Sequence, residues 1–327
     1  MTALLTLIVP FANALGAEPA PRNASDAKPQ LVSVLKIWDR GAHNAFTDLV
    51  RHQDRWLCCF REGQQHADPA GRIRILASSD GESWTSAALL EEQGYDLRDP
   101  KLSLMPDGRL MLLTGASVYA GSKYLTRSPR VAFSRDGRGW TRPEKVLAED
   151  HWLWRVTWHK GRGYCVSKLG EGRNPRRGFL YVTENGLDWT WVTEFKLDGV
   201  SETTLRFLPN DEMIALVRPG YIGHSMPPYT QWTWHKMKDK IGGPNFLRLP
   251  DGSLWAAARR YGADKRTTVL ARMTRNRYEP VLTLPSGGDN SYPGMVWNDD
   301  EKLLWMSYYS SHEGKASIYL AKVRFER

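Results

Sequence analysis

Six segments of the chain share one pattern: a short apolar run, a polar turn, and a second apolar run that ends on a polar or aromatic residue. They cover residues 48–61, 102–115, 156–168, 205–218, 246–260 and 294–309. Apolar runs of this length around turns such as Pro106-Asp107-Gly108 are typical of β-hairpins, because Asp and Gly adopt tight-turn conformations at little cost. The chain therefore contains six predicted hairpins, and none of its segments shows a long helical period.

The spacing of these hairpins predicts the fold. Their turns fall near residues 54, 107, 161, 210, 251 and 299, so successive turns lie about 41 to 54 residues apart. This is the repeat length of a propeller blade of about four strands. We therefore expect an all-β fold, a six-bladed β-propeller with four antiparallel strands per blade. The alternative is a two-sheet sandwich in which the regular spacing is chance.

Three further segments repeat the pattern Ser/Thr-x-Asp/Asn-Gly-x-x-Trp, beginning at Ser78, Ser134 and Thr183. The Asp or Asn side chain can accept hydrogen bonds from its own turn, the Gly can take a positive φ, and the Trp can pack between adjacent sheets. The Gly of each copy follows a hairpin turn by about 25 to 30 residues, where the two outer strands of a blade would be joined. We interpret these Asp-box-like repeats as structural turns without a chemical role.

The N-terminus predicts export. Residues 1–17 resemble a signal peptide, because an apolar stretch ends there in small residues, although the basic segment that usually precedes such a stretch is absent. This stretch is too short to span a membrane. A Pro-rich polar linker is expected over residues 18–35 and a single propeller domain over residues 36–327. We therefore expect a secreted or periplasmic protein; a disordered N-terminus that is not a signal is the alternative.

The charge distribution indicates the class of partner, and the number of cysteines indicates whether disulfides are expected. The formal charge of +9 is spread along the chain rather than gathered in runs, so we expect no nucleic-acid partner and favour an acidic glycan. Three cysteines are too few for a disulfide framework. Cys58 and Cys59, in one predicted strand, and Cys165, in an equivalent strand, are expected to be buried free thiols. We expect no cofactor and no metal, and the sequence does not define an oligomeric state.

In a propeller, the inner hairpin of every blade brings its first and last residues to the same end of the central axis. The strand starts are His43-Asn44, Arg98-Asp99, Trp154-Arg155, Ser201-Glu202, Pro244-Asn245 and Ser291-Tyr292, and the strand ends are Arg61-Glu62, Thr114, Lys168, Arg218, Arg259-Arg260 and Tyr308-Tyr309. Arg occurs in five of the six units, and its planar fork binds a carboxylate in a bidentate way, so this ring predicts an anion clamp. The alternative for any single Arg is an ion pair with Glu62, Asp99 or Glu202.

The repeats, the hairpins and this ring together resemble the sialidase (neuraminidase) superfamily of exo-glycosidases over roughly residues 40–325. In that family a Glu begins the fourth inner strand and an Arg ends the paired strand about sixteen residues later, as Glu202 and Arg218 do here. Arg259 resembles a second family Arg in the next blade, and Tyr292 resembles the nucleophile that opens the last blade. The resemblance implies that Arg218 and Arg259 hold a substrate carboxylate.

The same resemblance implies a retaining hydrolase that removes a terminal acidic sugar from a glycan. Glu202 would act as base for Tyr292, because a phenol is a poor nucleophile until a neighbouring carboxylate takes its proton. A neutral phenol also avoids the repulsion that a carboxylate nucleophile would meet at an anionic substrate. Asp68, which is similar in position to the family's acid, or His66 beside it would protonate the leaving oxygen.

The chain departs from the family at the start of the first blade. The family has the first Arg of a three-Arg clamp there, whereas this chain has His43-Asn44. Arg40, Arg61 or Arg98 would have to supply the missing guanidinium, so the sugar is a sialic acid or a related ulosonic or uronic acid. The expected substrate-binding set is Arg218, Arg259, Arg61, Arg98, Arg155, His43, Asn44 and Asn245.

Two other functions compete with the hydrolase. His43 and His66, near a Tyr and several Arg, also resemble the propeller-type polysaccharide lyases, which abstract the C5 proton of a uronate. A propeller that binds acidic glycans without turnover is the third possibility. The interval between Glu202 and Arg218 favours the hydrolase over the lyase, and a binding protein has no need of Glu202 at the same blade end as Tyr292.

Overall fold

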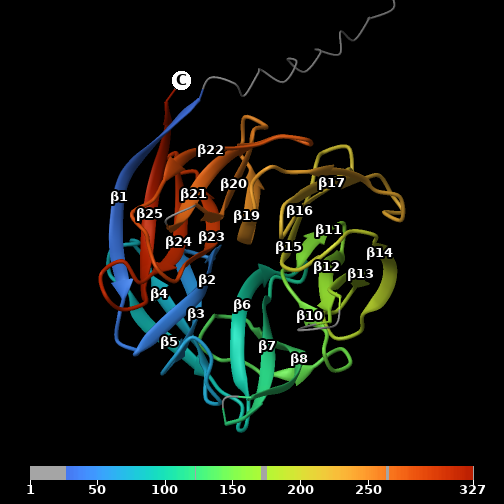
Figure 1. Cartoon of the computed structure of the whole chain (residues 1–327). Helices are drawn as coiled ribbons and strands as arrows, with labels where there is room; N and C mark the ends of the chain where they lie inside the picture. The colour runs from blue at the N-terminus through green and yellow to red at the C-terminus, as the bar shows by residue number, and fades with distance from the viewer. Residues whose placement is uncertain (1–26, 122, 171–174, 263–264, 327) are drawn as a thin grey trace, which may run out of the picture.

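The computed structural model describes residues 27–121, 123–170, 175–262 and 265–326. Within these residues the chain forms six antiparallel sheets arranged as blades around a central axis, and it contains no helix (Figure 1). The predicted six-bladed β-propeller is therefore confirmed. The same part of the chain has no helix long and apolar enough to cross a membrane. The predicted signal peptide, residues 1–17, lies outside the described residues.

The blades follow one another in chain order, and the first five run outward from the axis. Blade one is β2 (His43–His52), β3 (Arg55–Gly63), β4 (Arg72–Ser78) and β5 (Thr85–Leu90). Blade two is β6 (Asp96–Leu104), β7 (Leu110–Ala120), β8 (Lys123–Ser134) and β9 (Glu144–Lys145). Blade three has an interrupted inner strand, β10 (Trp152–Leu153) and β11 (Thr157–His159), followed by β12 (Arg162–Leu169), β13 (Arg177–Thr183) and β14 (Thr190–Phe195).

The second half repeats this plan. Blade four is β15 (Thr203–Phe207), β16 (Met213–Val217), β17 (Tyr221–Ser225) and β18 (Thr233–Lys236). Blade five is β19 (Ile241–Arg248), β20 (Leu254–Tyr261), β21 (Arg266–Met273) and β22 (Tyr278–Thr283). Blade six is β23 (Asn290–Asn298), β24 (Leu303–Ser310) and β25 (Ser317–Glu326), completed by β1 (Lys28–Trp38). Figure 1 shows the first strand of each blade nearest the centre.

The ring is closed by the two ends of the described chain. Strand β1 pairs antiparallel with β25, from Lys28 opposite Glu326 to Trp38 opposite Ile318, and forms the outer edge of blade six. The predicted linker over residues 18–35 is therefore wrong for residues 28–35, which belong to this strand. Backbone pairing with β25 holds these residues in the sheet, and partly buried side chains such as Leu31 and Val34 pack against the core between blades five and six.

The hydrophobic core consists of six clusters, one at each contact between neighbouring blades. Between blades six and one, for example, the rings of Trp56 and Trp305 stack with centroids 4.1 Å apart. Cys58 and Cys59 point into two different clusters, and Cys165 lies in a third. All three thiols are buried and free, as predicted. Because every interface is apolar, polar side chains are left for the axis and the loops.

The three Trp-containing repeats join the third and fourth strands of blades one to three, as predicted. In the first, Asp80 accepts hydrogen bonds from two turn N–H groups, and the Trp84 indole donates to the Gly81 carbonyl (2.9 Å). Gly81 has a φ of 78°, and a Cβ there would lie 2.0 Å from the Trp305 ring, so no other residue fits. Blade four has a related turn that the sequence pattern missed: the Trp232 indole donates to the carbonyl of Tyr229, which takes a φ of 66° without a Gly.

Candidate active site

Four inner strands contain a bulge near their start, in blades one, two, five and six. At these bulges Phe46, Asp99 and Tyr292 adopt φ angles of 63°, 51° and 55°, and Gly243 has a φ of 58°. Positive φ is rare for bulky residues, and a bulge changes the direction of the side chains around it. Phe46, Asp99 and Tyr292 all line one pocket at the axis.

This axial pocket has a volume of about 350 Å³. Its wall is formed by Phe46, His66, Arg98, Asp99, Ser117, Tyr119, Tyr124, Arg127, Trp152, Lys168, Arg176, Ser201, Glu202 and Tyr292. The cationic side chains Arg98, Arg127, Lys168 and Arg176 come from blades two and three, and the acids are Asp99 and Glu202. The pocket thus has one basic side, which could face an anionic group of a ligand.

The predicted Tyr and Glu meet in this pocket although they come from blades six and four, and the predicted Arg contacts the Glu from outside the lining. The Tyr292 hydroxyl donates to Glu202 Oε1 (2.7 Å), and Arg218 Nη1 donates to the same oxygen (2.6 Å). The other oxygen, Oε2, accepts the backbone N–H of Gly243 (2.8 Å). Tyr292 and Glu202 are both buried, so water competes little for these bonds.

The environment sets the protonation of this pair. Burial by itself raises the pKa of Glu202, but the charge of Arg218 and the hydrogen bonds from Tyr292 and Gly243 bring that pKa below its ordinary value. Burial, followed by the negative charge of Glu202, raises the pKa of Tyr292 well above its ordinary value. The resting site therefore holds a phenol beside a carboxylate, with the proton acceptor in hydrogen-bonding contact.

Asp99 is a second carboxyl group at the pocket. Burial raises its pKa, as does the negative charge of Glu202, against the opposing effect of Arg98 and Lys101. Its Oδ1 is buried and has no hydrogen-bond partner among the described residues. A carboxyl group with a raised pKa and an uncommitted oxygen can donate a proton to a bound ligand.

A third carboxylate, Asp289, lies just before β23 and joins blades five, six and one. Its Oδ1 accepts from the Tyr309 hydroxyl (2.8 Å) and from Arg259 Nη2 (3.2 Å). Its Oδ2 contacts His66 Nδ1 (2.6 Å) and His43 Nε2 (3.2 Å). Burial opposes ionisation, but the hydrogen bonds from the two His side chains hold the pKa of Asp289 far below its usual range.

These contacts change the predicted anion clamp. Arg218 is held by Glu202, and Arg259 is held by Asp289 and by the Asn290 carbonyl (2.6 Å). Both guanidinium groups therefore already bind protein oxygens. Of the predicted Arg residues, Arg98 lines the pocket, where its Nη1 lies 3.4 Å from Asp96 and 3.3 Å from the Tyr119 hydroxyl.

The expected role of Asp68 as the acid does not fit the structure. Asp68 accepts hydrogen bonds from three backbone N–H groups of its own loop and from Arg61 Nη2 (2.9 Å). Burial raises its pKa, but these bonds lower it more, to below its usual value. Arg61 is fully buried and also binds Asp96 (2.6 Å), so it holds the loop and is not part of a clamp.

Three more predicted binding residues have structural contacts instead. Arg155 Nη1 donates to both oxygens of the buried Asp48 (2.8 and 2.7 Å). The Asn44 amide donates to two backbone carbonyls (both 2.9 Å). The Asn245 amide donates to the carbonyl of the residue that follows Tyr292 (3.0 Å). These side chains position the inner strands, and the axial pocket is not lined by them.

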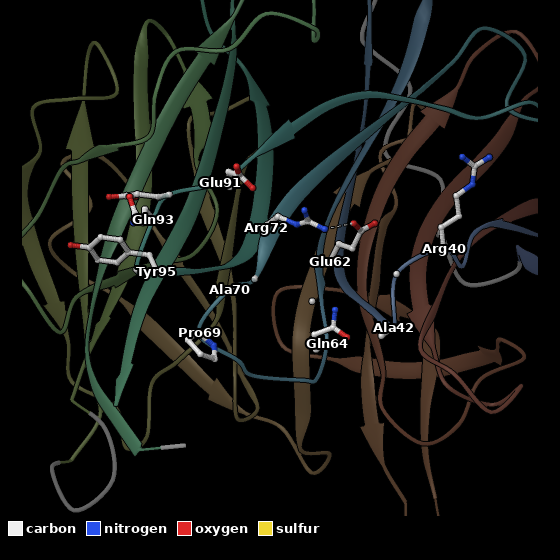
Figure 2. A pocket seen from close by; sticks show the side chains of 15 residues that line it. Arg40, Ala42, Glu62, Gln64, Pro69, Ala70, Arg72, Glu91, Gln93 and Tyr95 are labelled. Atoms are coloured by element: carbon white, nitrogen blue, oxygen red, sulfur yellow. Dashed lines mark hydrogen bonds and ion pairs between the residues drawn. The ribbon is translucent and has the colours of Figure 1, made fainter. Parts of the chain in front are cut away.

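A larger pocket of about 790 Å³ is lined by the segments that enter blade one, join its second and third strands, and leave it (Figure 2). Its labelled side chains include Arg40, Gln64, Pro69 and Tyr95, and Glu62 is paired with Arg72 (3.2 Å). Its lining contains neither the Tyr–Glu pair nor the buried acid of the axial pocket. Arg40, a suggested replacement for the missing clamp Arg, lines this larger pocket and stacks on Trp38.

Sequence reasoning missed the roles of Asp99 and Asp289. Asp99 stood in the predicted ring, but only as an ion-pair partner, because nothing in the spacing shows a bulge that turns it inward. Asp289 follows Gly287-Gly288 directly before the strand of Tyr292. A carboxylate on the loop that enters an inner strand is the signal that could have identified it.

No protein-family model and no curated protein matches the chain. Solved structures do. A protein of unknown function from Dyadobacter fermentans is 18% identical, with a TM-score of 0.78, over 91% of this chain and 99% of that one. The GH93 α-L-arabinofuranosidase of Fusarium graminearum, solved with arabinobiose, is 16% identical, with a TM-score of 0.70, over 90% of this chain and 98% of that one. Trypanosoma rangeli sialidase, solved with sialic acid, is 12% identical, with a TM-score of 0.64, over 91% of this chain and 59% of that one. The chain is thus similar in fold to sialidase-like propellers.

Proposed function

We propose that this protein is a retaining exo-glycoside hydrolase that removes a terminal acidic sugar from a glycan. The observation that carries the proposal is the 2.7 Å hydrogen bond from the Tyr292 hydroxyl to the Glu202 carboxylate in the axial pocket. The similarity in fold to a sialidase and to an arabinofuranosidase supports it. Secretion is part of the proposal and rests on residues 1–17 of the sequence.

In the first step, the Tyr292 oxygen attacks the anomeric carbon while the bond to the leaving oxygen breaks. The phenol proton passes to Glu202, and Asp99 gives its own proton to the leaving oxygen. In the second step, the Asp99 carboxylate takes a proton from water, and the water oxygen attacks the anomeric carbon. The bond to Tyr292 breaks, and Glu202 returns the proton to the phenol. Two displacements at one carbon retain its configuration.

The substrate class follows from the shape and charge of the pocket. A volume of about 350 Å³ is at the small end of ligand pockets, which favours a single terminal sugar over the interior of a chain. Because Arg98, Arg127, Lys168 and Arg176 give one side of the pocket a positive potential, we assign the substrate anion to that side.

The test is turnover of aryl glycosides of sialic acid, related ulosonic acids, uronic acids and arabinofuranose. We expect release of the aryl group from an acidic sugar, and loss of at least about a thousandfold in Tyr292→Phe. Tyr308→Phe is the matched control, because its hydroxyl bonds the Pro285 carbonyl (2.9 Å) outside the pocket. Thermal unfolding of both variants checks the fold. Full activity in Tyr292→Phe would rule out this mechanism, and turnover of arabinofuranoside alone would rule out the acidic substrate.

The lyase alternative requires one of the two His side chains to act as a base. The structure brings His43 and His66 together, but both bind Asp289 rather than the Tyr292 hydroxyl. A lyase would produce an unsaturated uronate, so ultraviolet absorbance is followed beside aryl release on a uronate polysaccharide. Growth of that absorbance, with no aryl release, would replace the hydrolase by the lyase. Binding of an acidic glycan without either product would indicate a binding protein.

A further inference from the structure

Three potential metal ligands converge at the edge of the axial pocket. His43 lies at the start of β2, His66 on the loop between β3 and β4, and Asp289 directly before β23. One ligand atom from each lies within 4.8 Å of the other two. Both His side chains contact the same oxygen, Asp289 Oδ2, at 3.2 and 2.6 Å. The reaction proposed above uses none of these three side chains.

We propose that His43, His66 and Asp289 bind a divalent first-row transition-metal ion, with Zn²⁺ the preferred ion. Two imidazole nitrogens and one carboxylate oxygen are a common ligand set for this ion, with a further position left open. Ligands about 2.0 to 2.1 Å from a tetrahedral ion lie about 3.3 Å from one another. The distance from His43 Nε2 to Asp289 Oδ2, 3.2 Å, already has this value. The His66 contact, 2.6 Å, has to lengthen by about 0.7 Å to reach this separation, and the exposed His66 side chain has room to move.

The surroundings hold the three ligands in place. The Tyr309 hydroxyl and Arg259 occupy Asp289 Oδ1, which leaves Oδ2 to face the two imidazoles. Three backbone hydrogen bonds to Asp68 brace the loop that carries His66. The Asp289 N–H donates to Ser311 Oγ (2.9 Å). Such outer contacts orient metal ligands and strengthen binding.

The guanidinium of Arg259 limits the expected affinity for the metal ion. Arg259 lies 3.2 Å from Asp289 Oδ1, so a second cation on this carboxylate meets electrostatic repulsion. We therefore expect a dissociation constant on the order of micromolar rather than nanomolar.

The proposed metal site adjoins the axial pocket on the side of His66. His66 lines that pocket, and its ring packs edge-on against Phe46 with centroids 5.2 Å apart. The ion is therefore suited to bind an oxygen ligand, either water or a hydroxyl or carboxylate oxygen of a sugar. The metal site can be tested without substrate, so its failure is distinguishable from failure of the hydrolase proposal.

The experiment uses the tag-free full chain after treatment with a chelator. Zn²⁺ binding is measured by calorimetry, and Co²⁺ is followed by its visible absorption, which reports nitrogen and oxygen ligation directly. We expect one ion per chain, and an affinity loss of at least about tenfold in His43→Ala, His66→Ala and Asp289→Asn. His66 is more than half exposed, so His66→Ala is expected to fold, which thermal unfolding checks. His235→Ala, at an exposed position of β18, is the matched control.

The proposal predicts that Ca²⁺ and Mg²⁺ do not compete with Zn²⁺, because imidazole is a poor ligand for these hard cations. It is overturned if the chelator-treated protein binds no Zn²⁺ in the micromolar range. Equal Zn²⁺ affinity in His66→Ala and the unmodified protein would also overturn it.

Discussion

Asp99→Asn separates proton donation from every other function of this side chain. Asn has the size of Asp and keeps its carbonyl oxygen, but it cannot give a proton to a leaving group. Asp99 Oδ1 is buried and has no hydrogen-bond partner in the described chain, and burial raises the pKa of this carboxyl group. A general acid in this position accelerates the reaction by about 10² to 10⁴-fold, which corresponds to about 3 to 5 kcal/mol of transition-state stabilisation.

The assay compares a phenyl glycoside with a dinitrophenyl glycoside of the same sugar. Phenol is a poor leaving group and needs the proton, whereas dinitrophenolate leaves without it. We therefore expect Asp99→Asn to lower the rate of glycosyl transfer to the enzyme by the full factor for the phenyl substrate and only slightly for the dinitrophenyl substrate. Pre-steady-state kinetics isolates this step. Equal losses with both substrates would refute the assignment, and a selective loss in His66→Asn instead would transfer the role of the acid to His66.

Three further predictions concern stability, pH and thiol reactivity. Asp48→Ala leaves Arg155 buried without its carboxylate partner, so we expect the free energy of unfolding, measured with denaturant, to decrease by about 3 to 5 kcal/mol. Asp300→Ala removes an exposed ion pair and serves as the control. Equal decreases in the two variants would contradict this reasoning. The pKa of Glu202 is lowered and that of Asp99 is raised. We therefore expect kcat/KM to stay high at acidic pH and to decrease as pH rises through the pKa of Asp99. If Asp99→Asn shows the same decrease with pH, Asp99 is not its cause. The three cysteines are buried with raised pKa values, so a thiol reagent should label none of them in the native protein, and rapid labelling would show that β3 or β12 opens.

The architecture was predictable because each blade is a local unit. A hairpin and its turn lie within about fifteen residues, and turns such as the one around Gly81 and Trp84 involve a few consecutive residues. Such patterns depend on backbone conformation and alternating burial, which are visible in sequence. The edge strand β1 was missed because its partner, β25, lies almost 300 residues away, so no neighbouring hairpin marks it in the sequence.

The candidate site was predictable only in part. Blade geometry placed Glu202, Arg218 and Tyr292 in the predicted ring, the resemblance to sialidases singled them out, and the structure brings them into contact. Sequence spacing does not show which partner a charged side chain takes. Asp68 was expected at the substrate, yet its loop turns the carboxylate toward Arg61 and the backbone. The bulge at Asp99 likewise changes which side chains face the axis, because it shifts the register of β6 against β7.

The same bulges explain why residues outside the pocket matter for Tyr292. A Tyr at a φ of 55° is strained, and such a conformation persists only where neighbouring groups hold it. Thr47 Oγ1 donates to the Tyr292 carbonyl (2.9 Å) from blade one, and the Asn245 amide donates to the next carbonyl (3.0 Å) from blade five. Gly243 supplies the remaining space, because a Cβ there would lie 2.7 Å from the Tyr292 ring. Asn245 therefore contributes by fixing the backbone of the proposed nucleophile, so that its hydroxyl meets Glu202 before any substrate binds.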